Sequence, residues 1–580
     1  MIAKMKFLVA FTLLAGLASA ALAAPLRPDV VGKIASQPPS AHSIDLRAYL
    51  VATTSTADAA TITRQLNNSR QTQSLLQYTL LRRCDAKFDA WAKNIDALRF
   101  LKEFLADNEW MELVLTAGPL PNAPRGKPAT TYGDVIQQLA TIAARRGSAS
   151  ESRLGKTLAT ALAMHYPTLD IERVLGRYDY FWKSDQLGKL HPVFKTHTPW
   201  TMRYVVSIFG SADGSWEYLR DTFNVPISEY GRMCWVARYR LHNAFGDSIH
   251  GSRFYAPWSS KLPKWENVHK NGGVCGSLST IGATITMAHG IPASTMGEPG
   301  HCAWTWRPRD GHWQPSYSLS SHSSLKTATW SSHYVYLQLA ENTLGNREQT
   351  SIRKLGWTAE ALADAAQFKA AAKLYQSALE KSPEAYDLWL AYVDLLNKPD
   401  AALTPTQAAA VATQIITRLA AWPEPAQNLL NRMTAFAKLP VETRRATFVQ
   451  MHRNLLAAKF HSKTVLKRVL PAQGKSLGAI DAQVHLFREL LTLHATSEQQ
   501  KFYGQILEFP AAHRRNRDAT KKLAQAMLDV ATKNPTCKHS SAIVAKAIQT
   551  AIELGDVGLF QTACALAEKS FLPKPGSALD

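Results

Sequence analysis

The sequence predicts an α+β chain that is mostly helical, with several domains and one central α+β core. Three observations lead to this expectation. Apolar residues recur at three- and four-residue intervals over much of residues 24–190 and 346–580, which is the pattern of amphipathic helices. Tryptophan, glycine and histidine concentrate instead in residues 191–345. The length of 580 residues is enough for about three or four domains.

Composition narrows the class of protein and of partner. Hydrophobic residues make up 46% of the chain and charged residues 19%, which excludes a mainly disordered protein. Six cysteines are too few for a disulfide scaffold. The net charge of +21 favours an anionic partner such as a cell-envelope polymer. The basic residues are scattered and form no recognised nucleic-acid-binding motif, so we expect no nucleic acid partner.

Residues 1–23 have the three regions of a signal peptide. Lys4 and Lys6 precede an apolar run over residues 7–17, and residues 18–23 contain two A-x-A cleavage signals. We therefore expect an exported protein, either periplasmic or secreted. No later stretch approaches the roughly 18 apolar residues of a membrane span, so we expect no transmembrane helix in the mature chain.

Residues 24–190 are expected to form an N-terminal helical domain. Residues 98–105 show the apolar spacing of an amphipathic helix most clearly. A Gly-Pro-Leu-Pro sequence at 118–121 marks a loop, and helical spacing resumes over residues 135–145 and 154–165. This range carries no catalytic motif, which favours a scaffold role.

Residues 346–580 read as helix after helix, interrupted by prolines. Ala371, Tyr375, Ala378 and Pro383 follow the spacing of the second half of a tetratricopeptide repeat. The first half of that repeat matches poorly, and later segments do not repeat the pattern cleanly. We therefore expect a C-terminal helical, TPR-like region of helical hairpins, with a plain helical bundle as the alternative.

Residues 191–345 combine a helix with a β-hairpin. A helix is expected over residues 275–289, directly after two glycines. Two aromatic runs, 301–307 and 312–319, flank an Asp-Gly pair, which is a strong hairpin signal.

This order of elements can carry nucleophilic chemistry. Gly272 and Gly273 permit a tight turn that presents Cys275 at a helix N-terminus, where unpaired amides and the helix dipole favour a thiolate and a developing oxyanion. His301, 26 residues later on a neighbouring strand, can take the thiol proton. Cys275 and His301 are therefore the candidate catalytic residues.

Three short sequences together suggest a family. Gly-Gly-Val-Cys at 272–275, His-Gly-Ile-Pro-Ala at 289–293 and His-x-x-Trp at 301–304 resemble the transglutaminase-like core. This core is the circularly rearranged branch of the papain-like cysteine enzymes, and the resemblance covers about residues 271–317.

The resemblance carries expectations about fold and chemistry. It implies a transglutaminase-like, papain-like α+β core within residues 191–345. Cys275 matches the family nucleophile and His301 the family general base. The family includes transglutaminases, bacterial proteases and peptide deglycosylases, so the implied chemistry is acyl transfer or amide hydrolysis.

The sequence departs from the family at the third catalytic position. Members usually carry an Asp or Asn on the strand after the histidine strand, where it orients the imidazole. Depending on the length of the turn, His301 is expected opposite Ser318 or Ser320. Residues 312–326 contain no Asp, Glu or Asn.

Supporting roles fall to residues elsewhere in the core. Asp247 and Asn271 are candidates for orienting the imidazole. Trp258 and Trp265 are candidates for donating an indole N–H to the oxyanion. His289 is expected to cap the end of the helix rather than to act as a base.

The remaining chemistry concerns metals and disulfides. Histidine is common in residues 191–345, but no His-Glu-x-x-His, paired Cys-x-x-Cys or His-x-His spacing appears, so we expect no metal and no cofactor. In an exported protein Cys537 can pair with Cys564, and Cys84 with Cys234, although sequence does not decide connectivity.

The leading functional hypothesis is an exported thiol hydrolase or acyltransferase. It would act through Cys275 and His301 on amide bonds of peptides, proteins or glycopeptides. The alternative is a catalytically inactive transglutaminase-like protein that binds or scaffolds partners in the cell envelope. A metal-dependent hydrolase is the third interpretation.

Overall fold

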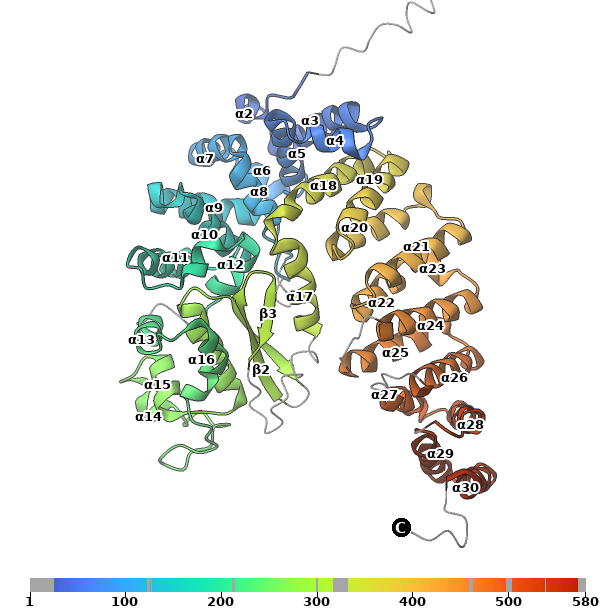
Figure 1. The fold of residues 1–580 in the computed structure, drawn as a ribbon. Coiled ribbons are helices and arrows are strands. Elements are labelled where there is room, and N and C mark those ends of the chain that lie inside the picture. Colours follow the sequence, from blue (N-terminus) through green and yellow to red (C-terminus); the bar gives the residue numbers. More distant parts are fainter. Residues whose placement is uncertain are drawn as a thin grey trace, which may run out of the picture. The chain divides into compact units, whose positions relative to one another are not determined.

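A computed structural model of the chain describes residues 26–571, apart from residues 123–125, 127, 211–213, 299–300, 317–331, 458–462, 497–502 and 538. The predicted signal peptide, residues 1–23, lies outside the described residues. The described chain is mostly helical and contains a small three-stranded antiparallel sheet (Figure 1). The mostly helical α+β composition predicted from the sequence is therefore confirmed.

The chain divides into two compact units. Unit 1 comprises Met1–Ser207 and Asn346–Ser382, and unit 2 comprises Ile208–Gly345 and Pro383–Asp580. Each unit thus contains two separate stretches of sequence. The contiguous ranges 24–190, 191–345 and 346–580 stay predictions of domain boundaries.

Unit 1 is entirely helical over its described residues. The apolar spacing of residues 98–105 lies within one helix, whose buried side chains include Phe100, Leu101, Phe104 and Leu105. The helices are α2 (Val30–Lys33), α3 (Pro39–Thr54), α4 (Ala59–Gln65), α5 (Ser69–Leu81), α6 (Ala86–Trp91), α7 (Ile95–Ala106), α8 (Asn108–Thr116), α9 (Tyr132–Arg146), α10 (Arg153–His165), α11 (Ile171–Gln186), α12 (Pro199–Val206), α18 (Thr350–Asp364) and α19 (Phe368–Lys381). The helices predicted around 98–105, 135–145 and 154–165 are confirmed as α7, α9 and α10.

The α18–α19 hairpin belongs to unit 1 because polar contacts fix it to α5. Glu360 of α18 pairs with Arg82 at 2.6 Å and with Arg83 at 2.8 Å. The Tyr78 hydroxyl donates to Asp364 at 2.6 Å. Side chains of α19 at positions 371, 375 and 378, which share the predicted repeat spacing, are all buried.

Unit 2 contains the sheet and most of the C-terminal helices. Its elements are α13 (Ser215–Thr222), α14 (Ala256–Ser259), α15 (Lys264–Asn271), α16 (Cys275–Ala288), β1 (Ala293–Glu298), β2 (His301–Arg309), β3 (His312–Pro315), α17 (Ser332–Leu344), α20 (Tyr386–Leu396), α21 (Pro405–Arg418), α22 (Pro423–Arg432), α23 (Thr434–Ala437), α24 (Val441–Ala457), α25 (Lys463–Leu477), α26 (Ile480–Thr496), α27 (Tyr503–Leu507), α28 (Arg517–Lys533), α29 (Ser540–Leu554) and α30 (Val557–Phe571).

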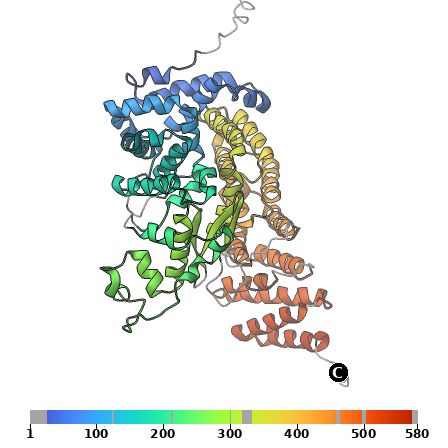
Figure 2. The same ribbon diagram turned by 60° about the vertical axis from the view of Figure 1, so that its left-hand side comes forward.

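The C-terminal helices of unit 2 follow one another as neighbours. Helix α21 contacts α24, which contacts α26, and the series continues through α28, α29 and α30. Figure 2 shows this succession in orange and red. Consecutive neighbours of this kind agree with an array of helical hairpins. The resemblance of these hairpins to tetratricopeptide repeats stays a prediction.

The sheet has the order β1–β2–β3, and both pairs are antiparallel. Arg309 pairs with His312 across the Asp-Gly turn, where Gly311 has a φ of +73°, so the predicted hairpin is confirmed. The register shifts between Trp306 and Arg309. Trp304 and Trp313 are fully buried and form part of the core of unit 2.

A buried ion pair holds α17 to the hairpin. Arg307 of β2 donates to Glu341 of α17, with an Nη2–Oε1 distance of 2.8 Å. Both side chains are buried. Glu341 also accepts from the Gly311 amide at 3.0 Å and from the Trp313 indole at 2.9 Å. The carboxylate is therefore fully hydrogen-bonded, which burial of a charge requires.

None of the helices in the described part of the chain combines the length and the hydrophobicity needed to cross a bilayer.

Candidate functional site

Cys275 is the first residue of α16. Val274 occupies the N-cap position and supplies no side-chain hydrogen bond to the first turn. The first helical bond runs from the Leu278 amide to the Val274 carbonyl at 3.0 Å. The amides of residues 275–277 are thus the uncapped donors of a helix N-terminus, where partial positive charge favours an anion.

Two glycines shape the approach to Cys275. Gly272 has a φ of +76°, and a Cβ atom there would lie 2.2 Å from the Arg238 carbonyl oxygen. A Cβ atom on Gly273 would lie 2.7 Å from the Tyr255 hydroxyl oxygen. Both positions therefore exclude any side chain.

The glycines lie this close to their neighbours because the backbone pairs there. The Gly273 amide donates to the Arg238 carbonyl at 3.0 Å, and the Arg240 amide donates to the Gly273 carbonyl at 2.9 Å. Tyr239 and Gly273 form a parallel bridge. This pairing fixes the turn that leads into α16.

Tyr255 adds a side-chain contact to the same turn. Its hydroxyl donates to the Gly272 carbonyl at 2.8 Å and lies 3.3 Å from the Ser277 hydroxyl. Burial raises the pKa of Tyr255, so it keeps its proton and remains a donor. Cys275 itself is half-buried, and a Cβ atom on the next residue, Gly276, would meet nothing within 4 Å. Open space therefore lies beside Gly276 in the first turn of α16.

His301 begins β2, and the topology places it at the same end of the structure as Cys275. Helix α16 has 14 residues and is about 20 Å long. The chain then turns through Gly290, and the six residues of β1 return over about 20 Å. Because β2 is antiparallel to β1, it runs in the same direction as α16.

A contact between Gly282 of α16 and Trp304 of β2 aligns the helix with the strand. A Cβ atom on Gly282 would lie 3.1 Å from Cε2 of Trp304. Cys275 precedes Gly282 by about 10 Å of helix, and His301 precedes Trp304 by about 10 Å of strand. Figure 1 shows α16 along the sheet. The backbones of Cys275 and His301 therefore lie toward the same end of α16 and β2, while the imidazole of His301 lies outside the described residues.

The supporting candidates are placed as follows. The Asp247 carboxylate accepts from the Asn243 amide group at 3.0 Å, and its own backbone N–H donates to Asn243 at 2.9 Å. The Asn271 amide group donates to the side chain of Asn267 at 2.9 Å within α15. Both side chains thus stabilise local structure. Ser318 and Ser320, the positions expected opposite His301, lie outside the described residues.

The two tryptophans differ. The indole N–H of Trp265 is buried and donates to the Phe209 carbonyl at 2.8 Å, so in this structure it is already used by the backbone. Trp258 is half-buried and its ring lies 5.6 Å from the ring of Phe245. Trp258 stays a candidate.

His289 is the C-cap residue of α16, as expected. Its Nδ1 lies 2.8 Å from the Ile285 carbonyl and its Nε2 lies 3.0 Å from the Arg220 carbonyl. Burial lowers the pKa of this imidazole. Both ring nitrogens are occupied, so His289 has no free position for proton transfer.

The structure adds an exposed apolar segment that the sequence had not singled out. It consists of Trp235, Tyr239, Leu241 and Phe245, which are each at least half exposed. Tyr239 belongs to the bridge with Gly273, two residues before Cys275. In the sequence, large apolar residues alternate with arginine between 235 and 241. Large apolar side chains that are exposed together commonly mark a binding surface, so this alternation is the signal that could have indicated the segment.

The other cysteines provide a contrast. Burial raises the pKa of the Cys234 thiol to about 11 and also raises that of Cys84. The Cys537 thiol donates to the Ala495 carbonyl at 3.1 Å. Cys84, Cys234, Cys537 and Cys564 are all thiols rather than disulfides. Neither of the two pairings left open by the sequence is formed.

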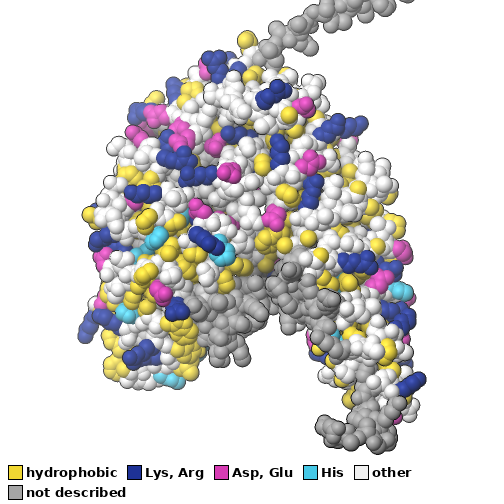
Figure 3. Space-filling view, viewed as in Figure 1, with side chains coloured by type: hydrophobic (Ala, Val, Ile, Leu, Met, Phe, Trp, Pro, Cys, Tyr) yellow, Lys and Arg dark blue, Asp and Glu magenta, His cyan; other side chains and the backbone are white. Residues whose placement is uncertain are grey.

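The last two features concern the distribution of basic side chains and the groups that could bind a metal ion. On the face shown in Figure 3, lysine and arginine side chains are dispersed among the other types rather than gathered in one patch. Within the residues that the structure describes, no group of three or more His, Cys, Asp or Glu side chains is placed to hold a metal ion.

The described chain is mostly helical. In unit 2, α16 packs against a small sheet, and Cys275 is the first residue of this helix, whose N-terminus has no side-chain cap. Comparisons with known proteins add nothing to this description: no family model, no curated protein and no solved structure matches the chain.

Proposed function

We propose that the protein is an exported cysteine hydrolase or acyltransferase that acts on amide bonds. The observation that supports the proposal is that Cys275 begins α16 and His301 begins β2, two elements that pack together and run in the same direction. A thiol at a helix N-terminus with an imidazole carried by the adjacent strand is an arrangement suited to forming a thiolate. The resemblance of the motifs to the transglutaminase-like core agrees with it.

The chemistry follows from these groups. His301 takes the proton of the Cys275 thiol, and the sulfur attacks the carbonyl carbon of the amide. The negative charge on the carbonyl oxygen is stabilised by the uncapped amides of the first turn of α16. The tetrahedral intermediate collapses to a thioester, and His301 gives its proton to the leaving amine.

Turnover requires a second nucleophile, which takes the acyl group from Cys275. Water attacks the thioester in a hydrolase, and a substrate amine does so in an acyltransferase, with His301 again removing the proton of the nucleophile. In both cases the Cys275 thiol is regenerated. Tyr255 is a positioning residue in this scheme, because its hydroxyl holds the Gly272 carbonyl and with it the turn before Cys275.

Substrates are expected to carry an apolar group near the scissile bond. Tyr239 of the exposed apolar segment pairs with Gly273, two residues before Cys275, and the segment offers large side chains with unburied surface. Peptides, proteins and glycopeptides all meet this requirement. The sequence of residues 1–23 supports action in the periplasm or outside the cell.

Trapping of the thioester tests the proposal. The mature chain is mixed with a library of acylated aromatic amides, quenched in acid and analysed by mass spectrometry of its peptides. The expected result is an acyl adduct on the peptide that contains Cys275, lost in Cys275→Ser and unchanged in Cys537→Ser. Adducts distributed over several cysteines, or none on Cys275, contradict it.

The competing function is a binding or scaffolding protein that has lost turnover. The absence of Asp, Glu and Asn from residues 312–326 favours it, because the imidazole then has no acidic partner on the next strand. A folded protein that leaves every amide intact and whose Cys275 does not react with thiol-directed activity probes under reducing conditions supports this alternative.

A further inference from the structure

Residues 232–270 of unit 2 carry a large share of the protein's excess positive charge. The stretch holds seven Lys or Arg residues against two Asp or Glu residues. Arg232 and Lys270 pair with nearby glutamates. The other five basic side chains make no ion pair with a carboxylate in the part of the chain that the structure describes: Arg238, Arg240, Arg253, Lys261 and Lys264. Their charges are therefore left for a partner.

The same stretch contains the exposed apolar segment. Each of its four side chains is at least half exposed, and Phe245 is 70% exposed. Four of the five unpaired cations are exposed as well, namely Arg238, Arg253, Lys261 and Lys264. Figure 3 shows hydrophobic and basic side chains interspersed where Figure 1 places α14 and α15. Large apolar side chains and unpaired cations are thus exposed in one part of unit 2.

A short hairpin presents Phe245 to solvent. His242 and Ser248 form an antiparallel bridge at its base. The side-chain oxygen of Asn243 accepts from the Phe245 amide at 2.8 Å and from the Asp247 amide at 2.9 Å. These bonds satisfy the backbone of the turn, so Phe245 is held at the tip of an ordered loop.

Contacts tie this hairpin to the basic residues that follow it. The Phe245 ring lies 5.6 Å from the ring of Trp258. The Asn243 side chain donates to the Phe254 carbonyl at 3.0 Å. The Lys261 amide in turn donates to the Trp258 carbonyl at 2.9 Å. The apolar tip and the cations are therefore carried by one folded piece of unit 2.

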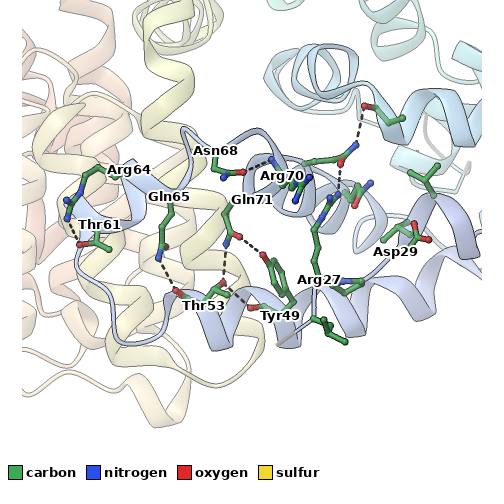
Figure 4. Close-up of a pocket in the computed structure, with 17 residues that line it drawn as sticks. Arg27, Asp29, Tyr49, Thr53, Thr61, Arg64, Gln65, Asn68, Arg70 and Gln71 are labelled. Carbon is green, nitrogen blue, oxygen red and sulfur yellow. Dashed lines mark hydrogen bonds between the residues drawn. The ribbon is translucent and has the colours of Figure 1, made fainter. Parts of the chain in front are cut away.

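A pocket in unit 1 shows the contrasting case. It has a volume of about 1180 Å³, and Figure 4 shows the side chains that line it. The Tyr49 hydroxyl donates to Gln71 at 2.8 Å, Gln71 donates to the Thr53 hydroxyl at 3.1 Å, and Arg27 donates to the Gln73 side chain. These polar groups bond to one another, whereas the cations of residues 232–270 have no such partners.

The combination of exposed apolar side chains and unpaired cations restricts the kind of partner. A polyanion in water can pair with the cations but leaves the apolar side chains in water. An apolar protein surface can cover those side chains but would bury the cations unpaired, which is costly. A bilayer of anionic lipids meets both requirements, because its headgroups carry phosphates and its interfacial region receives aromatic rings.

We propose that residues 232–270 bind the surface of a bilayer that contains anionic lipids. Phe245 inserts at the level of the headgroups, where aromatic rings are favoured. Arg253 and Lys261 pair with lipid phosphates. The contact lies on one face of the bilayer and requires no membrane-spanning helix.

This inference goes beyond the proposed function, since lipid binding requires no turnover at Cys275. The two roles are compatible. Tyr239 pairs with Gly273, so a bilayer bound at the exposed apolar segment lies close to the turn before Cys275. A substrate with an apolar anchor in that bilayer would reach the thiol from the membrane side.

Sedimentation of the mature full chain with lipid vesicles tests the proposal. The vesicles contain phosphatidylcholine alone or mixed with phosphatidylglycerol, at an ionic strength of about 0.15 M. We expect binding to the mixed vesicles that weakens as salt is added, and roughly tenfold or more weaker binding to phosphatidylcholine alone. No substrate is present, so failure of this test is distinct from failure of catalysis.

Three substitutions locate the contact. Arg253→Ala and Lys261→Ala are each expected to weaken binding to the mixed vesicles by about fivefold, which is the effect of one basic residue near an anionic bilayer. Phe245→Ala is expected to weaken it several-fold, because less apolar surface then leaves water. Circular dichroism checks that each variant is folded.

Two substitutions in unit 1 are the matched controls. Arg99 is highly exposed and pairs with Asp96 at 3.5 Å, and Ile95 is 70% exposed, as Phe245 is. Both residues belong to α7. Arg99→Ala and Ile95→Ala should leave vesicle binding unchanged.

Four results overturn the proposal. The first two are the absence of binding to the mixed vesicles and equal binding to both kinds of vesicle. The third is a loss in the controls as large as in the three variants, which assigns binding to the general charge of +21. The fourth is a loss in Arg253→Ala and Lys261→Ala with none in Phe245→Ala, which assigns the surface to a polyanion instead of a membrane.

Discussion

Gly282 and Trp304 are in direct contact across the interface of α16 and the sheet. A Cβ atom on Gly282 would lie 3.1 Å from the Trp304 ring and 2.8 Å from the Cys234 backbone nitrogen. The missing side chain lets the helix lie close to β2. This close packing holds α16, which begins with Cys275, against β2, which begins with His301.

Gly282→Ala is therefore expected to displace α16 from the sheet. The added methyl group overpacks a buried interface and should destabilise the protein by about 1–3 kcal/mol. The melting temperature and the reactivity of Cys275 with iodoacetamide measure the two effects. Gly276→Ala is the control, since its methyl group meets nothing within 4 Å, and a loss as large as that of Gly282→Ala would contradict the interpretation.

Gly272→Ala tests the turn before Cys275. A residue with a side chain at positive φ costs about 1–2 kcal/mol, and here the methyl group also meets the Arg238 carbonyl at 2.2 Å. We expect a larger loss of stability than in Gly555→Ala, which has a φ of +61° and open space around it. Only the first variant should change the labelling of Cys275. Equal melting temperatures for the two variants would show that the close approach of Gly272 to the Arg238 carbonyl does not determine stability.

Glu341→Ala tests the buried ion pair with Arg307. Removal of Glu341 leaves a buried guanidinium that, among the described carboxylates, still pairs with Asp310 at 2.9 Å, and typical losses are about 3–5 kcal/mol. Hydrogen exchange of β2 and β3 should become faster. Asp481→Ala, which breaks an exposed pair with Lys522 at 3.0 Å, should change stability by less than about 1 kcal/mol. Similar effects of the two variants would argue against a structural role for Glu341.

Stability should fall in mild acid because of His452 and His494. Both are buried, and His452 Nδ1 lies 2.8 Å from His494 Nε2 while Gln473 Oε1 accepts from His452 Nε2 at 3.1 Å. Burial lowers the pKa of both imidazoles, that of His452 from 6.5 to about 4. Between pH 6.5 and about pH 4 the unfolded chain therefore binds more protons than the folded chain. The free energy of unfolding decreases as the pH falls through this range.

The size of this effect can be checked with thermal denaturation between pH 7 and pH 4. The contribution from His452 alone is on the order of 3 kcal/mol at the acid end. The double variant His452→Gln, His494→Gln should show a shallower dependence on pH. His250→Gln, which changes an exposed histidine, should keep the original slope. A wild-type melting temperature that stays constant below pH 6 would contradict the prediction.

Phe245→Ala tests the exposed apolar segment. Phe245 is 70% exposed, so its removal should change stability by less than about 0.5 kcal/mol. Once a substrate is identified, KM should rise several-fold with little change in kcat, because the lost contact serves binding rather than the reacting atoms. Leu187→Ala, which removes a similarly exposed side chain in unit 1, should leave both constants unchanged. An unchanged KM for Phe245→Ala would exclude this segment from substrate binding.

Local patterns were sufficient to predict much of the core of unit 2. The two glycines before Cys275 and the helical pattern after it predicted α16, and the Asp-Gly pair predicted a hairpin whose turn has either two or four residues. The structure has the two-residue turn, with Arg309 opposite His312. These features depend on neighbours in sequence. Turn and helix chemistry act over a few residues, so a single sequence shows them.

Contacts between distant residues were not predictable in the same way. Arg307 and Glu341 are 34 residues apart, and the indole of Trp265 meets the carbonyl of a residue 56 positions earlier. Nothing in a single sequence indicates that a tryptophan N–H is already used by a backbone carbonyl.

The rate at which iodoacetamide alkylates Cys275 at pH 7 in the wild type, in His301→Ala and in His312→Ala tests the central claim most directly. His312 pairs with Arg309 at the opposite end of β2 and is the matched control. We expect Cys275 to react at similar rates in the wild type and in His312→Ala, and several-fold more slowly in His301→Ala, because the imidazole that takes the thiol proton is then missing. Equal rates in all three proteins would contradict the claim.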